Sequence, residues 1–97
     1  MKNVDYLEKY CKSIRDTGNL QEIKLIDEVL NKILDYLRLE DFYNKTNRST
    51  VFERLYIQEG NIKIFEIAYE FHMDTKTLYN LRKKFNILVE LELDRYI

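Results

Sequence analysis

Apolar residues recur every three or four positions near the start of the chain, as they do along one face of a helix. The first stripe consists of Val4, Leu7, Cys11 and Ile14. Gly18 follows this stripe and supplies a helix stop. The pattern therefore predicts an opening helix that ends near residue 18, with Cys11 as a small apolar core residue.

A second and longer helix is expected to begin after Asn19, because Asn19 followed three residues later by Glu22 is typical of a capping box. It is expected to end between Leu39 and Tyr43. Apolar residues share or border one wide face of this helix: Leu20, Ile23, Leu25, Ile26, Val29, Leu30, Ile33, Leu34 and Leu37. The short first helix cannot cover that face. We therefore expect either one core shared with the rest of the chain or a homodimer through the N-terminal helices.

The remaining pattern predicts three further helices. Residues 44–49 are polar and form a linker. Thr50 with Glu53 resembles a second capping box that opens a third helix. A fourth helix is expected over about Lys63–Phe71 and a fifth over about Thr75–Val89. From residue 89 to 94, apolar and acidic residues alternate, which suits an edge strand as well as a helix end.

These elements predict an all-α protein, a small bundle of about five helices. The chain has 97 residues with two Gly and no Pro, whereas a β-sandwich needs many tight turns. Its 45% hydrophobic and 34% charged content suits a folded domain rather than a disordered one. We expect an N-terminal helical hairpin at residues 1–48, a helix-turn-helix module at residues 49–89 and a C-terminal tail at residues 90–97.

Residues 64–83 have the spacing of a helix-turn-helix. Two helices that cross closely need a small residue at the crossing, apolar neighbours, an apolar plug in the turn and apolar residues that face back from the second helix. Six positions meet these needs: Ile67, Ala68, Phe71, Met73, Leu78 and Leu81. Asp74 is placed to cap the second helix.

Four short runs within residues 51–86 carry a family resemblance: Tyr56–Gly60, Glu66–Ala68, Asp74–Thr75 and Leu78–Lys83. With these runs the chain resembles the fourth region of bacterial sigma factors and the similar modules of short phage or mobile-element regulators, such as the ArpU type. The resemblance implies a helix-turn-helix whose second helix enters the DNA major groove, and it adds RNA polymerase as a possible partner.

Three features depart from the common family pattern. His72 stands where the turn usually has glycine, so a left-handed backbone there is less comfortable. Asp74 replaces the usual serine and could repel a nearby phosphate. Asn61 and Ile62 lengthen the approach to the fourth helix.

Charge favours DNA binding locally and not globally. The chain has 16 basic and 17 acidic residues, so it lacks the strongly basic field that is the simplest sign of a nucleic-acid-binding protein. Residues 75–89, in contrast, contain four cations and no acid. The candidate base contacts, at helical spacings on one side, are Thr75, Lys76, Tyr79, Asn80 and Lys83. The candidate phosphate contacts are Arg82, Lys84, Lys45 and Arg48.

Other interpretations stay open. Cations are common near a helix C-terminus, where the helix dipole favours them. The helix-turn-helix could also be pure architecture in a non-DNA-binding adaptor or assembly module, and a phage DNA-packaging subunit would share the features of a regulator. The thirteen Tyr and Phe residues are expected mostly in the core, with Tyr79 as an exposed exception.

The chain offers little material for catalysis or metal binding. Cys11 is the only cysteine and His72 the only histidine, which excludes an intrachain disulfide and a multi-cysteine zinc site. No catalytic constellation is visible. No apolar signal core or membrane-spanning run is visible either. The sequence therefore predicts a cytoplasmic, non-enzymatic transcriptional regulator that binds double-stranded DNA without a cofactor, a metal or a membrane.

Overall fold

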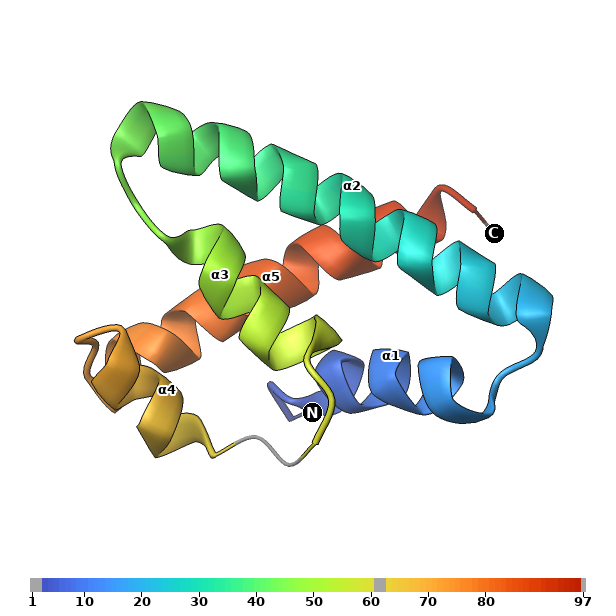
Figure 1. Cartoon of the computed structure of the whole chain (residues 1–97), viewed down its shortest axis with the longest axis horizontal. Coiled ribbons are helices and arrows are strands. Elements are labelled where there is room, and N and C mark those ends of the chain that lie inside the picture. Colours follow the sequence, from blue (N-terminus) through green and yellow to red (C-terminus); the bar gives the residue numbers. More distant parts are fainter. Residues whose placement is uncertain (1–2, 61–62, 97) are drawn as a thin grey trace.

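The computed structural model describes residues 3–60 and 63–96, and this part of the chain is helical without strands (Figure 1). The helical segments are α1 (Tyr6–Thr17), α2 (Leu20–Asn44), α3 (Arg48–Phe52), the π-helical turn η1 (Glu53–Ile57), α4 (Ile64–Glu70) and α5 (Thr75–Asp94). The turn η1 continues α3 without a break, so these six segments form five helices. The predicted all-α small bundle is confirmed.

Gly18 and Asn19 separate α1 from α2, as the sequence predicts. A side chain at Gly18 would place its Cβ 2.5 Å from the backbone oxygen of Ile14, so this close approach requires glycine. Asn19 Oδ1 accepts a hydrogen bond from the Glu22 N–H at 2.9 Å, and Glu22 Oε1 accepts one from the Asn19 N–H at 3.0 Å. These two bonds complete the predicted capping box.

Asp41, near the end of α2, organises the connection to α3. Its Oδ1 accepts from the Arg48 N–H at 2.9 Å and from the Thr46 hydroxyl at 2.6 Å, while Oδ2 accepts from the Ser49 N–H at 3.0 Å. Burial acts against the charged form, but the hydrogen bonds outweigh it and hold the pKa of Asp41 below its usual value. The first turn of α3 is thus capped from the preceding helix.

This capping corrects the prediction of a Thr50–Glu53 capping box. Because α3 begins at Arg48, Thr50 lies inside the helix, where its hydroxyl cannot act as an N-cap. The Glu53 carboxylate instead accepts a hydrogen bond from Arg38 of α2 at 2.9 Å.

One hydrophobic core collects side chains from every helix. Six residues of the wide apolar face of α2 are buried in it: Ile26, Val29, Leu30, Ile33, Leu34 and Leu37. Helices α1, α3 and α5 and the turn η1 all pack against α2. The apolar face of α2 is therefore covered by the rest of the chain in one shared core, the first of the two alternatives that the sequence left open. The N-terminal hairpin and the C-terminal helices share this core.

The turn η1 supplies the aromatic centre of this core. Tyr56 stacks on Phe52 with ring centroids 4.5 Å apart, and Phe85 of α5 meets Phe52 edge-on at 5.2 Å. The Tyr56 hydroxyl donates a hydrogen bond to Asn86 Oδ1, and Asn86 in turn donates to the backbone oxygen of Val4. These contacts fix α5 against both η1 and the start of the chain.

Helix α5 is longer than the sequence predicts, which corrects the assignment of residues 90–97 to a tail. Residues 90–94 are helical, so the strand-like alternation of this segment is a helix end. Val89 is buried and Leu93 packs against the core, while Leu91 between them is exposed. A helical period explains that alternation as well as a strand does, because Leu91 faces away from Val89 and Leu93.

The aromatic residues correct a second expectation. Only Phe52, Tyr56 and Phe85 are buried and Phe71 is partly buried. The other aromatic side chains are exposed: Tyr6, Tyr10, Tyr36, Phe42, Tyr43, Phe65, Tyr69, Tyr79 and Tyr96. Most of them lie on helix sides that point away from the buried stripes, so aromatic content alone did not indicate the core.

Candidate nucleic-acid interface

Helices α4 and α5 meet through a four-residue turn, residues 71–74. The six positions with helix-turn-helix spacing all contribute to packing. Ile67, Ala68, Leu78 and Leu81 are buried, and Phe71 and Met73 pack against the core from partly buried positions. The Met73 N–H donates to the Ala68 backbone oxygen at 2.8 Å, which closes the turn. The lengthening expected at Asn61 and Ile62 falls outside the described residues.

His72 has a φ of +55°, in the left-handed region. The resemblance to sigma-like modules predicts a glycine at this position, and only glycine adopts positive φ without strain. The backbone of this turn therefore has the conformation that a glycine would favour, with a histidine accommodated in it at some cost.

Asp74 caps α5, as predicted. Its Oδ1 accepts a hydrogen bond from the Thr77 N–H at 2.6 Å. The hydrogen bonds from Thr77 lower the pKa of Asp74, so the cap carries its full charge at neutral pH. A charged cap next to the first turn fixes the start of α5.

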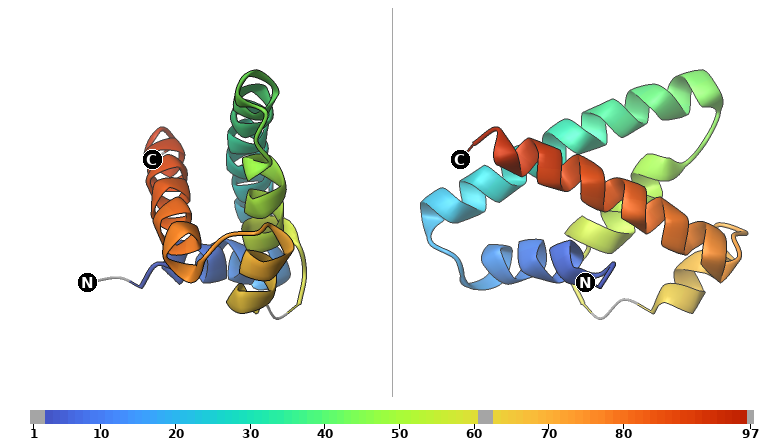
Figure 2. Two further views of the ribbon diagram at one scale, coloured as in Figure 1. Left: turned by 90° about the vertical axis from the view of Figure 1, so that its left-hand side faces the viewer. Right: turned by 180° about the vertical axis from the view of Figure 1, so that it is seen from behind.

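The candidate base contacts lie together on the outer side of the first half of α5. All of them are solvent-exposed: Thr75, Lys76, Tyr79, Asn80 and Lys83. Tyr79 is 48% exposed, and the Lys83 Nζ lies 5.4 Å from the centre of its ring. In the rear view of Figure 2, α5 lies in front of the other helices, and none of them covers this side.

The candidate phosphate contacts are less uniform. Lys84 and Lys45 are exposed and Arg48 is partly exposed. Lys84 and Arg48 line one shallow pocket of about 270 Å³ between α2 and α5. Lys45 lies at the end of α2 with a left-handed φ of +54°. The structure thus brings Lys84 and Arg48 to the same pocket, beside the outer side of α5.

Arg82 must be removed from the predicted phosphate contacts. Its side chain is buried and makes a two-point ion pair with Glu8 of α1, with Nε–Oε2 at 2.9 Å and Nη2–Oε1 at 2.8 Å. Burial acts to lower the pKa of Arg82, but the hydrogen bonds and charge of Glu8 raise it overall. The guanidinium cannot reach a phosphate, because position 82 lies on the same side of α5 as the buried Leu78 and Phe85.

Glu8 is the partner that sequence analysis missed. It lies one residue after Leu7 and three before Cys11, so it belongs to the apolar stripe of the first helix. An acid at a buried helical position needs a cation, because a buried charge without a partner is costly. The spacing could have indicated that need, although not which cation meets it.

The helix dipole does not explain why the lysines of α5 lie where they do. Because α5 continues to Asp94, the exposed Lys76, Lys83 and Lys84 lie in its first half and not near its C-terminus. The first turn has no acid and the last turn no base, opposite to the preference of the helix dipole. The dipole explanation of the basic face therefore fails.

The described residues give no sign of a metal centre or a reactive thiol. They contain no group of three or more His, Cys, Asp or Glu side chains that could hold a metal ion. Burial raises the pKa of the Cys11 thiol to about 12, so it stays protonated at neutral pH. None of the described helices is long and apolar enough to cross a membrane.

Comparisons with known proteins gave no relative. No family model matched the chain, and no curated protein or solved structure matched it either. The resemblance to region four of sigma factors therefore stays a prediction, and the chemistry of the interface rests on its own geometry.

Proposed function

We propose that this chain binds double-stranded DNA by placing the first half of α5 in the major groove, as a transcriptional regulator of the sigma-like or phage type. The observation that carries the proposal is the two-sided character of α5. Leu78 and Leu81 are buried behind it, while the lysines and polar side chains in front are free of covering helices. A helix held from behind and open in front can enter a groove.

The exposed groups have the chemistry that groove recognition requires. The Asn80 amide can pair with adenine, and the Lys76 ammonium can bind the guanine acceptors. Lys84, Lys45 and Arg48 supply charge for backbone phosphates, which set the position of the protein without reading sequence. RNA polymerase is a further partner that the sigma-like resemblance implies.

Salt dependence tests the DNA proposal. Three to five phosphate contacts predict a log–log slope of about −2.7 to −4.5, a loss of roughly 40- to 500-fold between 50 and 200 mM salt. Fluorescence anisotropy with mixed-sequence duplexes measures this slope. The Tyr69→Ser variant on α4 is a control, because its side chain is 85% exposed and belongs to neither contact set. Absence of binding at 50 mM salt would exclude the proposal.

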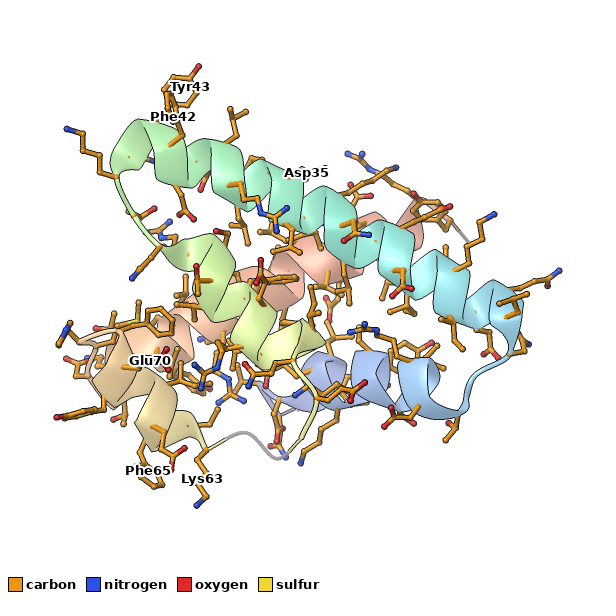
Figure 3. The ribbon with its side chains drawn as sticks, viewed as in Figure 1. Asp35, Phe42, Tyr43, Lys63, Phe65 and Glu70 are labelled. Carbon is orange, nitrogen blue, oxygen red and sulfur yellow. The ribbon has the colours of Figure 1, made fainter. Side chains whose placement is uncertain are left out.

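The exposed aromatic residues favour a second candidate, a protein-interaction module. Phe42 and Tyr43 project from the end of α2, and Phe65 projects from α4 (Figure 3). They are 78%, 74% and 67% exposed, respectively. Exposed aromatic anchors are typical of binding surfaces. An adaptor predicts no salt-dependent DNA affinity, so the anisotropy titration separates the two functions.

A further inference from the structure

A continuous seam of exposed residues follows the outer side of α5. It consists of Asn80, Lys84, Ile87, Leu91 and Asp94, which we call the α5 seam. The spacing is four, three, four and three residues, as in the contact line of two packed helices. Ile87 and Leu91 in its centre are both 58% exposed. Both views of Figure 2 place α5 as a separate layer on one side of the molecule, so this line is accessible to another helix.

Charge is ordered along the α5 seam. Lys83 and Lys84 lie before Ile87, while Glu90 and Asp94 lie after it. All four charged side chains are exposed. None of these four makes an ion pair among the contacts found in the described residues. Along α5 the exposed side chains are first basic, then apolar, then acidic. An antiparallel copy of the same helix therefore places its acidic end against the basic end of the first copy.

We propose that a second copy of the chain packs antiparallel on the α5 seam, with the two-fold axis at Ile87. In that register Ile87 meets itself, as a two-fold axis requires. Lys83 of each copy lies on the same flank of the contact as Glu90 of the other and meets it, while Leu91 of each copy lies beside Lys84 of the other. Asn80 faces Asp94. Opposite charges then meet on both sides of an apolar centre, and the same pairs occur twice by symmetry.

The pocket between α2 and α5 lies next to this register. Buried Leu37, Leu81 and Phe85 line it, and its volume of about 270 Å³ is below the ~300–1,000 Å³ of small-molecule sites. It suits a single apolar side chain. In the antiparallel register Leu91 of the second copy lies beside Lys84, one of the residues that line this pocket.

The rim of the pocket favours an acidic occupant. Arg48 and Lys84 line the pocket, and the acid of the same rim, Glu40, already accepts a hydrogen bond from the Tyr36 hydroxyl at 2.5 Å. The acidic and apolar stretch that follows Leu88 in this chain has the matching chemistry. A second copy is therefore the occupant, and it fits the surface without help from the proposed DNA binding.

Disulfide trapping tests the position of the axis in the full chain. Ile87→Cys places one thiol at the axis of each copy, and copper phenanthroline with oxygen oxidises the two thiols to a disulfide. The native Cys11 does not interfere, because it is fully buried. Tyr69→Cys on α4 is the matched control, exposed and away from the seam. We expect a linked dimer of Ile87→Cys within minutes at low micromolar protein and much slower linking of the control. Equal rates for the two variants would overturn the proposal.

A charge exchange tests the pairing. Lys83→Glu and Glu90→Lys should each weaken the dimer about tenfold in sedimentation velocity, because each creates two like-charge contacts. The double exchange should restore the affinity to within about threefold. Lys83 and Glu90 are seven residues apart, about 10 Å along the helix, beyond the three- or four-residue spacing of side-chain pairs within one helix, so rescue cannot be internal. A chain that is monomeric up to hundreds of micromolar, and that takes up an acidic apolar peptide at the pocket instead, would refute the proposal. So would a double exchange as weak as either single one.

Discussion

The ion pair between Arg82 and Glu8 is expected to be the most sensitive polar contact in the protein. It joins α1 to α5 across 74 residues of chain, with two hydrogen bonds of 2.9 and 2.8 Å. Both side chains are buried, with 7% of Arg82 and 3% of Glu8 exposed. Arg82→Leu keeps the apolar stem and removes the guanidinium, so the Glu8 carboxylate is left in the core without its cation.

Removing one partner of a buried ion pair costs about 3–5 kcal/mol, because the other charge stays buried. Arg82→Leu should lower the free energy of unfolding by that amount at pH 7. The double variant Glu8→Leu with Arg82→Leu should recover most of it, since no charge then remains in the core. For a domain of this size, each kcal/mol shifts the melting temperature by roughly 4–8 °C.

The loss of stability in Arg82→Leu should depend on pH, and the pKa of Glu8 determines whether the loss grows or shrinks as the pH rises. Burial raises the pKa of Glu8, and Arg82 opposes this rise. Without Arg82 the folded-state pKa rises further above the unfolded value. The folded variant then holds a proton that the unfolded chain releases, so its stability falls as the pH rises through this folded pKa. The deficit relative to the unchanged chain should be smallest near pH 4 and full at pH 7.

Urea unfolding followed by circular dichroism at several pH values measures both effects. A phosphate-binding Arg82 would behave differently: stability would be unchanged, while the salt slope of DNA binding would fall by about 1. A stability loss below about 1 kcal/mol, with no dependence on pH between 4 and 7, would falsify the structural role of the pair.

Three further changes test the turns and the interface. Gly18→Ala should cost about 1–3 kcal/mol in urea unfolding, because its Cβ would lie 2.5 Å from a backbone oxygen of α1; an unchanged midpoint would contradict the close approach. His72→Gly should raise the free energy of unfolding by about 0.5 kcal/mol, because the left-handed strain at φ +55° outweighs the extra freedom of the unfolded chain; a lower melting temperature would reject this balance. Asn80→Ala should relax discrimination among duplexes in competition anisotropy, whereas Lys45→Ala should weaken all duplexes alike. Equal behaviour of the last two variants would reject the division into base and phosphate contacts.

The sequence predicted those features that depend on neighbouring residues. Asn19 and Glu22 cap a helix through groups three residues apart, and Asp74 caps another through the Thr77 N–H. Such contacts are local, so a short window of sequence contains both partners. The apolar positions of α4 and α5 were predictable for the same reason, because the helical period alone determines which residues share a side.

Features that depend on distant partners were not predictable in this way. Arg82 looked like one cation among four, and only the packing of α1 on α5 shows that Glu8 takes it out of the interface. Asp41 caps α3 across a loop, which no capping-box spacing indicates. The end of α5 was missed because alternating residues 89–94 satisfy two periods at once. In each case the deciding information lies in tertiary contacts.

The two proposals for α5 exclude each other within one molecule. A second copy on the α5 seam covers Asn80, Lys83 and Lys84, which the DNA proposal places in or beside the major groove. The monomer should therefore be the form that binds DNA, and duplex DNA should shift the equilibrium away from the dimer, because a ligand that binds only one state draws the equilibrium toward it. Sedimentation velocity with and without a duplex measures this shift. Ile87→Asp, which weakens the seam, should bind DNA at least as tightly as the unchanged chain. If the disulfide-linked Ile87→Cys dimer bound the duplex with unchanged affinity, the two surfaces would not overlap.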